Sequence, residues 1–439
     1  MEKVFSLKER LLGSSTAERS KHYILGDAKP AGFHLEVKED AAVYQAASAG
    51  DLSAEQMINF LLSMALSRDA SDIHLEPTEK GLRVRLRVDG ILNNLDTYTR
   101  EMGSLVISRL KILAGMDIAE KRLPQDGNIP VMWAALPVNV RLSTLPTIRG
   151  EKMVIRLLRP DKIVIPLNTL GFKEEKYCSY LRFLRHTHGM ILVTGPAGCG
   201  KTTTLYSTLY HLNQPGRNVI TIEDPVEYRL AGVNQVQVNN KIKLTFARAL
   251  RHILRQDPDI IMIGEIRDNE TAEIATRAAL TGHQLFSTLH TNDAPGAVTR
   301  LLDMGVEPFL LASALVGVVA QRLFRLTCNH CREEYTPSTE ELAFYEEQSG
   351  SSAGDTLFTR GKGCEQCHFT GYLGRTAMHE IMPVDETMRK LILKAGGTEE
   401  IRRYAVNQGM QTLLKDGLSR VKEGLTTLQE VLQVAYTVC

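Results

Sequence analysis

The stretch Gly195-Pro-Ala-Gly-Cys-Gly-Lys-Thr202 decides the fold of this chain. It matches the pattern G-x-x-x-x-G-K-[ST], in which glycines let backbone N–H groups converge on phosphate groups. The apolar run 190–193 precedes it and the helix-forming run 203–207 follows it, so we expect a strand, a loop and a helix N-terminus. The loop residues are the predicted nucleotide-binding site: Gly195, Pro196, Ala197, Gly198, Cys199, Gly200, Lys201, Thr202 and Thr203.

Lys201 and Thr202 are expected to bind ATP and Mg²⁺. In such a loop the lysine reaches the β- and γ-phosphates and the hydroxyl binds the metal. The run 259–265, Asp-Ile-Ile-Met-Ile-Gly-Glu, predicts a second strand that delivers a carboxylate to the edge of the sheet. Gly264 stands where many P-loop enzymes have the magnesium-binding aspartate. We therefore expect Glu265 to hold the metal, polarise water, or do both.

A third strand ends in an acidic cluster suited to orienting the attacking water, made of Glu223, Asp224 and Glu227. A fourth ends in Ser287-Thr-Leu-His290, which places an imidazole at the same edge, either as a structural residue or as a sensor of the γ-phosphate. The sequence does not decide whether Glu223 or Glu265 activates water.

Strands and helices alternate beyond the loop, which predicts an α/β fold with a parallel sheet and helices on both faces. Helices are expected over 245–256 and 269–281. The uncharged run 309–320 is too short to span a bilayer and predicts a buried helix. Before the loop, a helix after Ser53, a second over 104–116 and an alternating strand at 81–90 predict an α+β domain.

In that alternating strand, Arg83, Arg85 and Arg87 occupy one face. The stripe is either a solvated strand face or a contact between domains. The predicted domain organisation is a leader (1–52), an α+β domain (53–160), a linker (161–170), an ATPase domain (171–327), a four-cysteine subdomain (328–380) and a helical C-terminal subdomain (381–439).

Four of the seven cysteines form two C-x-x-C pairs, which predicts a structural Zn²⁺ site with ligands Cys328, Cys331, Cys364 and Cys367. A redox-active pair and a nucleic-acid-binding finger are the alternatives. Cys199, inside the phosphate loop, is expected to be a low-pKa, oxidation-sensitive thiol.

The formal net charge is +1, and no basic or aromatic stripe marks a nucleic-acid-binding face. The N-terminal residues MEKVFSLKERLLGSS contain no apolar segment of the kind found in signal peptides, so we expect a cytoplasmic protein.

The motifs, in order, resemble those of the ATPase superfamily that serves bacterial type II secretion and type IV pilus assembly. The runs that resemble it include SDIHLEP, RLRVDG, GPAGCGKTTTLY, ITIEDPVEY, LRQDPDIIMIGEIRD, GHQLFSTLHTNDA and GYLGRTAMHEI. The resemblance implies a PAS-like N-terminal domain, a RecA-like ATPase domain and a homo-hexamer. It also implies an inner-membrane platform protein and a cytoplasmic recruitment protein as partners, with the ATPase peripheral to that membrane.

The resemblance further implies phosphate-facing arginines, for which the matching positions are Arg141, Arg251 and Arg255. Asn128 replaces the arginine that the family usually has after Gln-Asp-Gly. The expected function is ATP hydrolysis that powers assembly of a pilus or pseudopilus. The alternative from another class is a hexameric nucleic-acid translocase, which the charge distribution disfavours.

Overall fold

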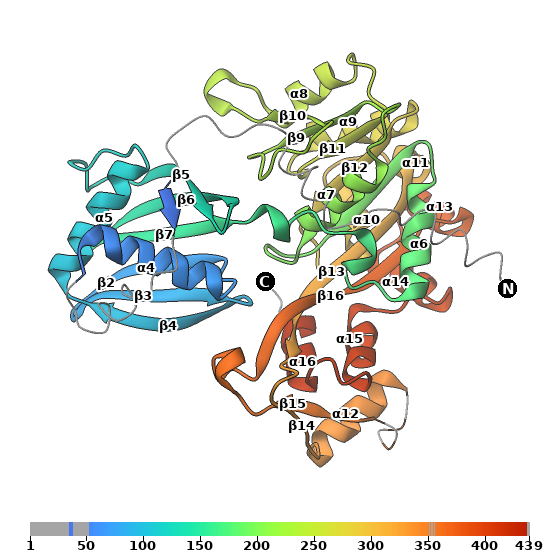
Figure 1. Ribbon diagram of the computed structural model, residues 1–439. Helices are drawn as coiled ribbons and strands as arrows, with labels where there is room; N and C mark the ends of the chain where they lie inside the picture. Colours follow the sequence, from blue (N-terminus) through green and yellow to red (C-terminus); the bar gives the residue numbers. More distant parts are fainter. Residues whose placement is uncertain (1–34, 38–51, 351, 353, 355, 437–439) are drawn as a thin grey trace. The chain divides into compact units, whose positions relative to one another are not determined.

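The computed structural model describes residues 35–37, 52–350, 352, 354 and 356–436. The leader expected over 1–52 therefore lies almost wholly outside the described residues. The described residues separate into two compact units, one up to Lys162 and one from Ile163 onward, which are called here the N-terminal unit and the C-terminal unit (Figure 1).

The N-terminal unit is an α+β structure in which two helices cover one face of a seven-stranded sheet. The strand order is β1-β5-β6-β7-β2-β3-β4, antiparallel except where β1 runs parallel to β5. Its elements are β1 (Leu35–Val37), α4 (Ala54–Ser67), β2 (Asp72–Thr78), β3 (Gly81–Val88), β4 (Ile91–Tyr98), α5 (Arg100–Leu113), β5 (Gln125–Trp133), β6 (Leu136–Thr147) and β7 (Gly150–Leu158).

Local sequence explains how this unit forms. Ser53 accepts a hydrogen bond from the Gln56 amide, and the Gln56 side chain accepts one from the Ser53 amide, so a capping box starts α4. Leu82, Val84 and Leu86 of β3 are buried. The alternation predicted for this strand is therefore confirmed.

The arginine stripe on the other face of β3 is neutralised by acids of β2. Arg83 and Arg85 each lie 2.8 Å from a Glu76 oxygen, and Arg87 lies 3.8 Å from Asp72. Burial raises the pKa of Glu76, but hydrogen bonds from Arg85, Lys152 and Arg83 outweigh it and hold that pKa down to about 2. The stripe is thus an ion-paired face of the sheet.

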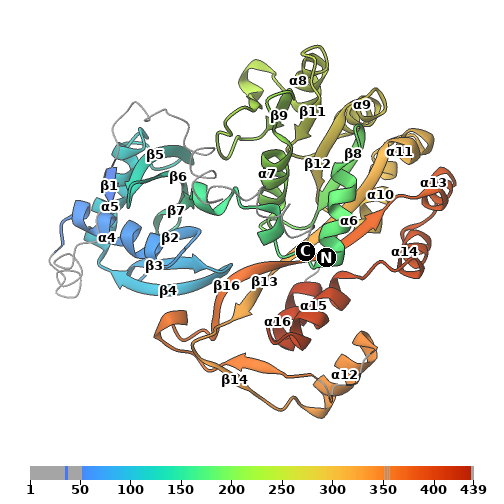
Figure 2. The ribbon, with the colours of Figure 1, turned by 45° about the vertical axis from the view of Figure 1, so that its right-hand side comes forward.

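The C-terminal unit is a sheet of seven strands between two layers of helices (Figures 1 and 2). The order is β10-β9-β11-β12-β8-β13-β16, parallel except for the antiparallel pair β13–β16. The strands are β8 (Gly189–Thr194), β9 (Val219–Glu223), β10 (Asn234–Gln237), β11 (Ile260–Ile263), β12 (Gln284–Leu289), β13 (Leu315–Thr327) and β16 (Tyr372–Pro383).

Successive residues of the central strands face opposite layers. Met190 and Leu192 pack in the core formed with α8 (Phe246–Ile253), α9 (Asn269–Leu280), α10 (Ala294–Asp303) and α11 (Pro308–Ala314), together with α13 (Glu386–Leu393) and α14 (Thr398–Asn407). Ile191 and Val193 pack in the other core, with α6 (Glu174–Leu184) and α7 (Lys201–Leu212). Burial on both faces explains why these strands read as continuous apolar runs.

The helix expected over 309–320 is wrong in its second half. Helix α11 ends at Ala314, and Leu315 begins β13, which pairs with β8. A short apolar run does not distinguish a buried helix from a strand buried on both faces, and the valines at 316, 318 and 319 favour the strand.

Two of the segments proposed as domain boundaries contribute to the C-terminal unit itself. Val164, Leu167 and Leu170, from the expected linker, are buried in the core that contains α7. Residue 380, the expected end of the four-cysteine subdomain, lies within β16.

The segment between β13 and β16 forms a small lobe of its own. It contains β14 (Arg332–Glu334), α12 (Thr339–Ser349) and β15 (Thr359–Gly361), and it shares a hydrophobic core with α15 (Leu413–Lys422) and α16 (Leu428–Tyr436). None of the helices in the described part of the chain has the length and apolar composition that a membrane crossing requires.

Candidate nucleotide and metal sites

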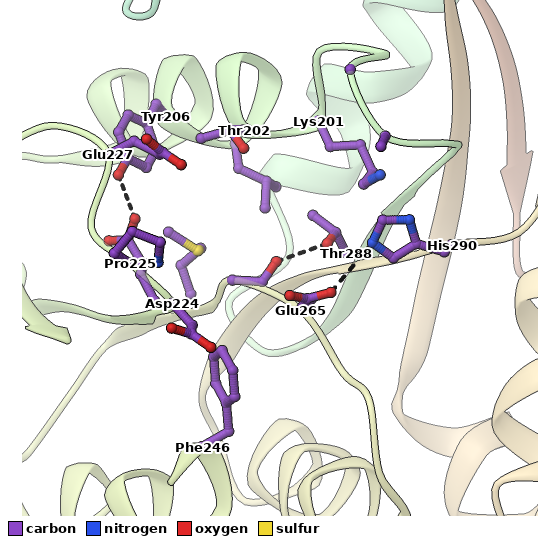
Figure 3. Close-up of a pocket in the computed structure, with 16 residues that line it drawn as sticks. Lys201, Thr202, Tyr206, Asp224, Pro225, Glu227, Phe246, Glu265, Thr288 and His290 are labelled. Atoms are coloured by element: carbon purple, nitrogen blue, oxygen red, sulfur yellow. Dashed lines mark hydrogen bonds and ion pairs between the residues drawn. The ribbon is translucent and has the colours of Figure 1, made fainter. Parts of the chain in front are cut away.

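Strands β8, β9, β11 and β12 end at a common pocket of about 240 Å³. Figure 3 shows Lys201 above Thr288 and His290, with Glu265 beside the imidazole. The pocket is lined by most of the predicted nucleotide and acidic residues, among them Ala197, Gly198, Lys201, Thr202, Glu223, Asp224, Glu227, Glu265 and His290.

The phosphate loop requires glycine at its turns. Gly195, Gly198 and Gly200 have φ values of 152°, 75° and 90°, and a Cβ added at Gly195 would lie 2.6 Å from the Gln321 carbonyl oxygen. Lys201 Nζ donates to the carbonyl oxygens of Gly195 (2.7 Å) and Pro196 (2.9 Å). The loop's own backbone therefore holds the ammonium group inside the pocket.

Strand β13 supports this loop through hydrogen bonds from Gln321, which the loop motif does not predict. Gln321 Nε2 donates to the Cys199 carbonyl (2.7 Å), and Gln321 Oε1 accepts from Thr204 Oγ1 of α7 (2.8 Å). Gln321 lies more than a hundred positions from the loop, so only the parallel pairing of β8 with β13 brings them together.

The prediction of a reactive Cys199 thiol is wrong. The side chain is only 4% exposed, and burial raises the pKa of Cys199 although Lys201 and Arg322 lower it. A thiol that stays protonated and covered is a poor nucleophile.

Glu265 lies between an imidazole and a guanidinium group. His290 Nε2 is 3.3 Å from one carboxylate oxygen, and the Arg267 guanidinium pairs with the other. Arg267 also lies 3.8 Å from Asp224, so it bridges the acids after β9 and β11. Arg267 was not among the predicted site residues, although it lies two residues beyond Glu265.

Gly264 lies close to β9. An added Cβ would lie 3.3 Å from the Ile222 carbonyl oxygen, tighter than most Cβ contacts, and 3.4 Å from Glu223 Cα. Thr288 Oγ1 donates to the Gly264 carbonyl (2.7 Å), and the Gly264 amide donates to Ile222 (2.8 Å). Residue 264 is therefore a direct neighbour of Glu223.

Glu223 is the most enclosed carboxylate of the pocket, with 4% exposure. Burial raises the pKa of Glu223, and hydrogen bonds from Thr221, Tyr206 and Gln235 act in the opposite direction. Tyr206 and Gln235 are further residues that the motif search missed.

Of the three predicted phosphate-facing arginines, Arg251 and Arg255 belong to the same unit as the pocket and do not line it. Arg251 pairs with Glu270 at 2.5 Å near the end of α8. The helix predicted over 245–256 ends at Ile253, so Arg255 lies beyond it. Arg141 lies on β6 of the N-terminal unit, opposite Asn128 and Arg156 in the strand register.

The four predicted zinc ligands lie together. Their sulfur atoms all lie within 4.8 Å of one another, with Cys328–Cys364 at 3.9 Å, Cys331–Cys367 at 3.8 Å and Cys364–Cys367 at 3.7 Å. With Zn–S bonds of about 2.3 Å, a tetrahedral ion places its sulfurs about 3.8 Å apart. The donor set therefore fits a structural zinc ion.

Backbone groups shape the second cysteine pair. The amides of Cys364 (3.2 Å) and Gly371 (3.3 Å) donate to Cys367 Sγ, as expected for a thiolate that accepts hydrogen bonds. Gly363 has a φ of 92°, and an added Cβ would lie 2.7 Å from the Phe369 carbonyl oxygen. Glycine is thus needed for this turn.

A phosphate loop at the carboxyl edge of a parallel sheet, facing carboxylates and a histidine, defines an ATP hydrolase of the P-loop class. The chain belongs to the family described as "Type II/IV secretion system protein", whose sequence model matches residues 47–433.

Relatives of the chain are similar over most of its length. It is 49% identical over 379 residues to "Type II secretion system protein E" of Pseudomonas aeruginosa, covering 86% of this chain and 75% of the relative. It is 48% identical over 380 residues to "Type IV pilus assembly ATPase PilB" of Thermus thermophilus, covering 87% of this chain and 43% of the relative.

Solved structures share the fold. The crystal structure of the pilus retraction motor PilT with bound ADP matches with a TM-score of 0.58 and 26% identity, covering 86% of this chain and 96% of that chain. The ATPase DotB of Legionella pneumophila matches with a TM-score of 0.64 and 20% identity, covering 91% and 98%. The predicted RecA-like ATPase fold is confirmed.

Proposed function

We propose that this chain forms a homo-hexamer that hydrolyses ATP to power assembly of a type IV pilus or a type II secretion pseudopilus. It acts at the cytoplasmic face of the inner membrane through a platform protein, to which a cytoplasmic recruitment protein brings it. The observation that carries the proposal is the pocket that joins the phosphate loop to Glu223, Glu265 and His290. Relatives named for both kinds of machine support this class of function.

In this proposal the side chains have distinct roles. Lys201 and the loop amides bind the phosphates, and Glu223 orients and deprotonates the attacking water. Thr202 and Glu265 would hold Mg²⁺, which when bound would supply positive charge against that developing on the phosphates. His290, 3.3 Å from Glu265, senses the γ-phosphate through that carboxylate.

The proposed domain division follows the expectation from the sequence, with the α+β domain at 53–160, the linker at 161–170 and the ATPase domain at 171–327. The four-cysteine subdomain at 328–380 binds one Zn²⁺, and the C-terminal helices complete the chain. The proposed phosphate-facing arginines are Arg141, Arg251 and Arg255.

A complementation experiment tests the biological role. A strain that lacks the gene should regain piliation or secretion with the wild-type chain and not with Lys201→Ala, which removes the phosphate-binding ammonium group. Equal rescue by both would contradict the proposal.

A biochemical experiment tests the alternative of a nucleic-acid translocase. Turnover of the purified chain should respond to vesicles containing anionic lipid or the platform protein, and should not respond to single- or double-stranded DNA. Stimulation by DNA alone would favour the translocase.

A further inference from the structure

Three hydroxyl or amide donors from three different elements converge on the Glu223 carboxylate. Tyr206 of α7 donates to Oε2, while Thr221 of β9 (2.5 Å) and Gln235 of β10 (3.1 Å) donate to Oε1. A carboxylate with both oxygens engaged in this way has a fixed orientation. It is therefore placed by its neighbours and not by its own backbone alone.

Tyr206 is the donor that connects this carboxylate to the phosphate loop. It lies five residues after Lys201 on α7, the helix whose N-terminus forms the end of the loop, and its side chain is fully buried. Burial and the nearby Glu223 charge raise the pKa of Tyr206, so its hydroxyl remains a donor. Figure 3 shows its ring on the same side of the pocket as Pro225 and Glu227.

Gln235 is itself held so that its amide nitrogen faces Glu223. Its Oε1 accepts from the Leu230 amide (2.6 Å), and its Nε2 donates to the Tyr228 carbonyl (2.8 Å) as well as to Glu223. The opposite amide orientation would lose these contacts. Edge strand β10 thus contributes a fixed donor.

We propose that Tyr206 is a positioning residue for ATP hydrolysis, which, with Thr221 and Gln235, fixes the Glu223 carboxylate relative to the helix that begins at the phosphate loop. The inference rests on the proposed role of Glu223 in activating water. This hydrogen bond couples the position of the carboxylate to α7, the helix that begins at the phosphate loop.

Two kinetic signatures distinguish positioning from a merely structural role. Tyr206→Phe keeps the ring and its packing, so ATP affinity should change less than about 2-fold while kcat falls about 10-fold. The Tyr206 hydroxyl is one of the groups that lower the pKa of Glu223. Its loss should therefore move the acidic limb of the kcat–pH profile to higher pH.

Tyr180 offers a matched control. It is another fully buried tyrosine whose hydroxyl contacts α7, at Thr208 Oγ1 (2.6 Å). Tyr180→Phe likewise removes a tyrosine hydroxyl that contacts α7, here from α6 and without touching Glu223, and should leave kcat and the pH profile unchanged.

Thr221 supplies a second, independent pair of variants. Thr221→Val removes the donor with little change in shape and should lower kcat, whereas Thr221→Ser retains the hydroxyl and should retain turnover. If Tyr206→Phe does not fold, this pair of variants still tests whether the hydrogen bonds to Glu223 support turnover.

Tyr206→Phe that matches Tyr180→Phe in both kcat and pH profile would overturn the inference, as would equal turnover of Thr221→Val and Thr221→Ser. Glu223→Gln separates this failure from that of the proposed function. Lost turnover in Glu223→Gln leaves the role of Glu223 intact, whereas wild-type turnover would overturn that role and the inference together.

Discussion

Strand β13 connects the nucleotide pocket to the four-cysteine site, and the two sites are stabilised in different ways. Near its middle, Gln321 braces the phosphate loop, and directly after its end Cys328 begins the four-cysteine site. The nucleotide pocket collects polar groups from separate strand ends and leaves Thr202 and His290 exposed. The cysteine site turns inward, with each sulfur 3.7 to 3.9 Å from another.

The difference predicts opposite consequences of substitution. A pocket that exchanges ligands is supported by the surrounding sheet, so removal of a ligand-binding group should change turnover and leave folding intact. A closed metal site is itself part of the fold, because ion binding contributes directly to folding free energy. We therefore expect substitutions to have their largest effect on folding at the cysteine site, and to act mainly on turnover in the nucleotide pocket.

Cys364→Ser should abolish stoichiometric zinc and unfold the lobe between β13 and β16. Structural zinc sites contribute about 10–16 kcal/mol of apparent binding free energy to folding. Elemental analysis of anaerobically purified protein should give one zinc per wild-type chain. Limited proteolysis should show new cleavage within residues 328–371 of the variant.

Cys178→Ser is the control, because Cys178 is an exposed cysteine outside the site. It should retain the metal and the cleavage pattern. Wild-type protein without zinc, or a Cys364→Ser variant as resistant to proteolysis as wild type, would contradict the inference that the cysteine site is part of the fold.

Lys201→Ala should lower ATP turnover by at least about 10³-fold, equivalent to about 4 kcal/mol of transition-state stabilisation. Among the described residues its ammonium group donates hydrogen bonds to two carbonyl oxygens of its own loop, so the melting temperature should stay close to that of wild type. Lys241→Ala, at an exposed lysine, is the control. A large loss of stability in Lys201→Ala would place this residue with the cysteines.

Arg141→Ala should bind ATP almost normally and lose turnover by about 10²- to 10³-fold. An arginine that reaches the γ-phosphate stabilises mainly the transition state, so kcat falls more than affinity. Arg149→Ala, in the hairpin after β6 where Arg149 pairs with Glu79, is the matched control. Unchanged kcat of Arg141→Ala in assembled protein would exclude this role and direct attention to Arg251 and Arg255.

Local motifs predicted the parts of both sites that depend on chain-local geometry. The phosphate loop, the acid at the end of β11 and the two cysteine pairs are each encoded within a few residues, and the structure brings their members together. Tyr206, Gln235 and Gln321 were not predicted, because the partners of a buried polar group depend on strand order, which no local pattern specifies.

The errors have the same origin. The run 309–320 is apolar throughout, and only its pairing with β8 separates helix α11 from strand β13. The reactivity expected of Cys199 followed from its place in the loop, whereas the structure buries its side chain and fastens its backbone carbonyl to Gln321 of β13. Sequence therefore predicted the chemistry of each element better than its surroundings.

The smallest predicted effect concerns His379. It lies on β16, the strand that leads from the four-cysteine site into the sheet that carries the nucleotide pocket. The imidazole is fully buried and stacks on Phe172 with ring centroids 3.8 Å apart. Among the described residues, neither ring nitrogen has a hydrogen-bond partner. The charged groups around it are Asp416, whose carboxylate accepts the His379 amide, and the cations Lys176 and Arg420.

Burial, together with Lys176 and Arg420, lowers the pKa of His379 from 6.5 to about 3, against the opposing effect of Asp416. Between these values the unfolded chain binds a proton that the folded chain does not, so stability is complete above about pH 6.5 and falls as the pH drops. The contribution from His379 should cost about 2 kcal/mol between about pH 7 and about pH 5. His379→Phe keeps the stacked ring without a titrating group, so urea titrations at the two pH values should differ less for this variant than for wild type. His186→Gln, at an exposed histidine, should behave as wild type. An identical pH dependence of stability in all three proteins would contradict the proposed effect of His379.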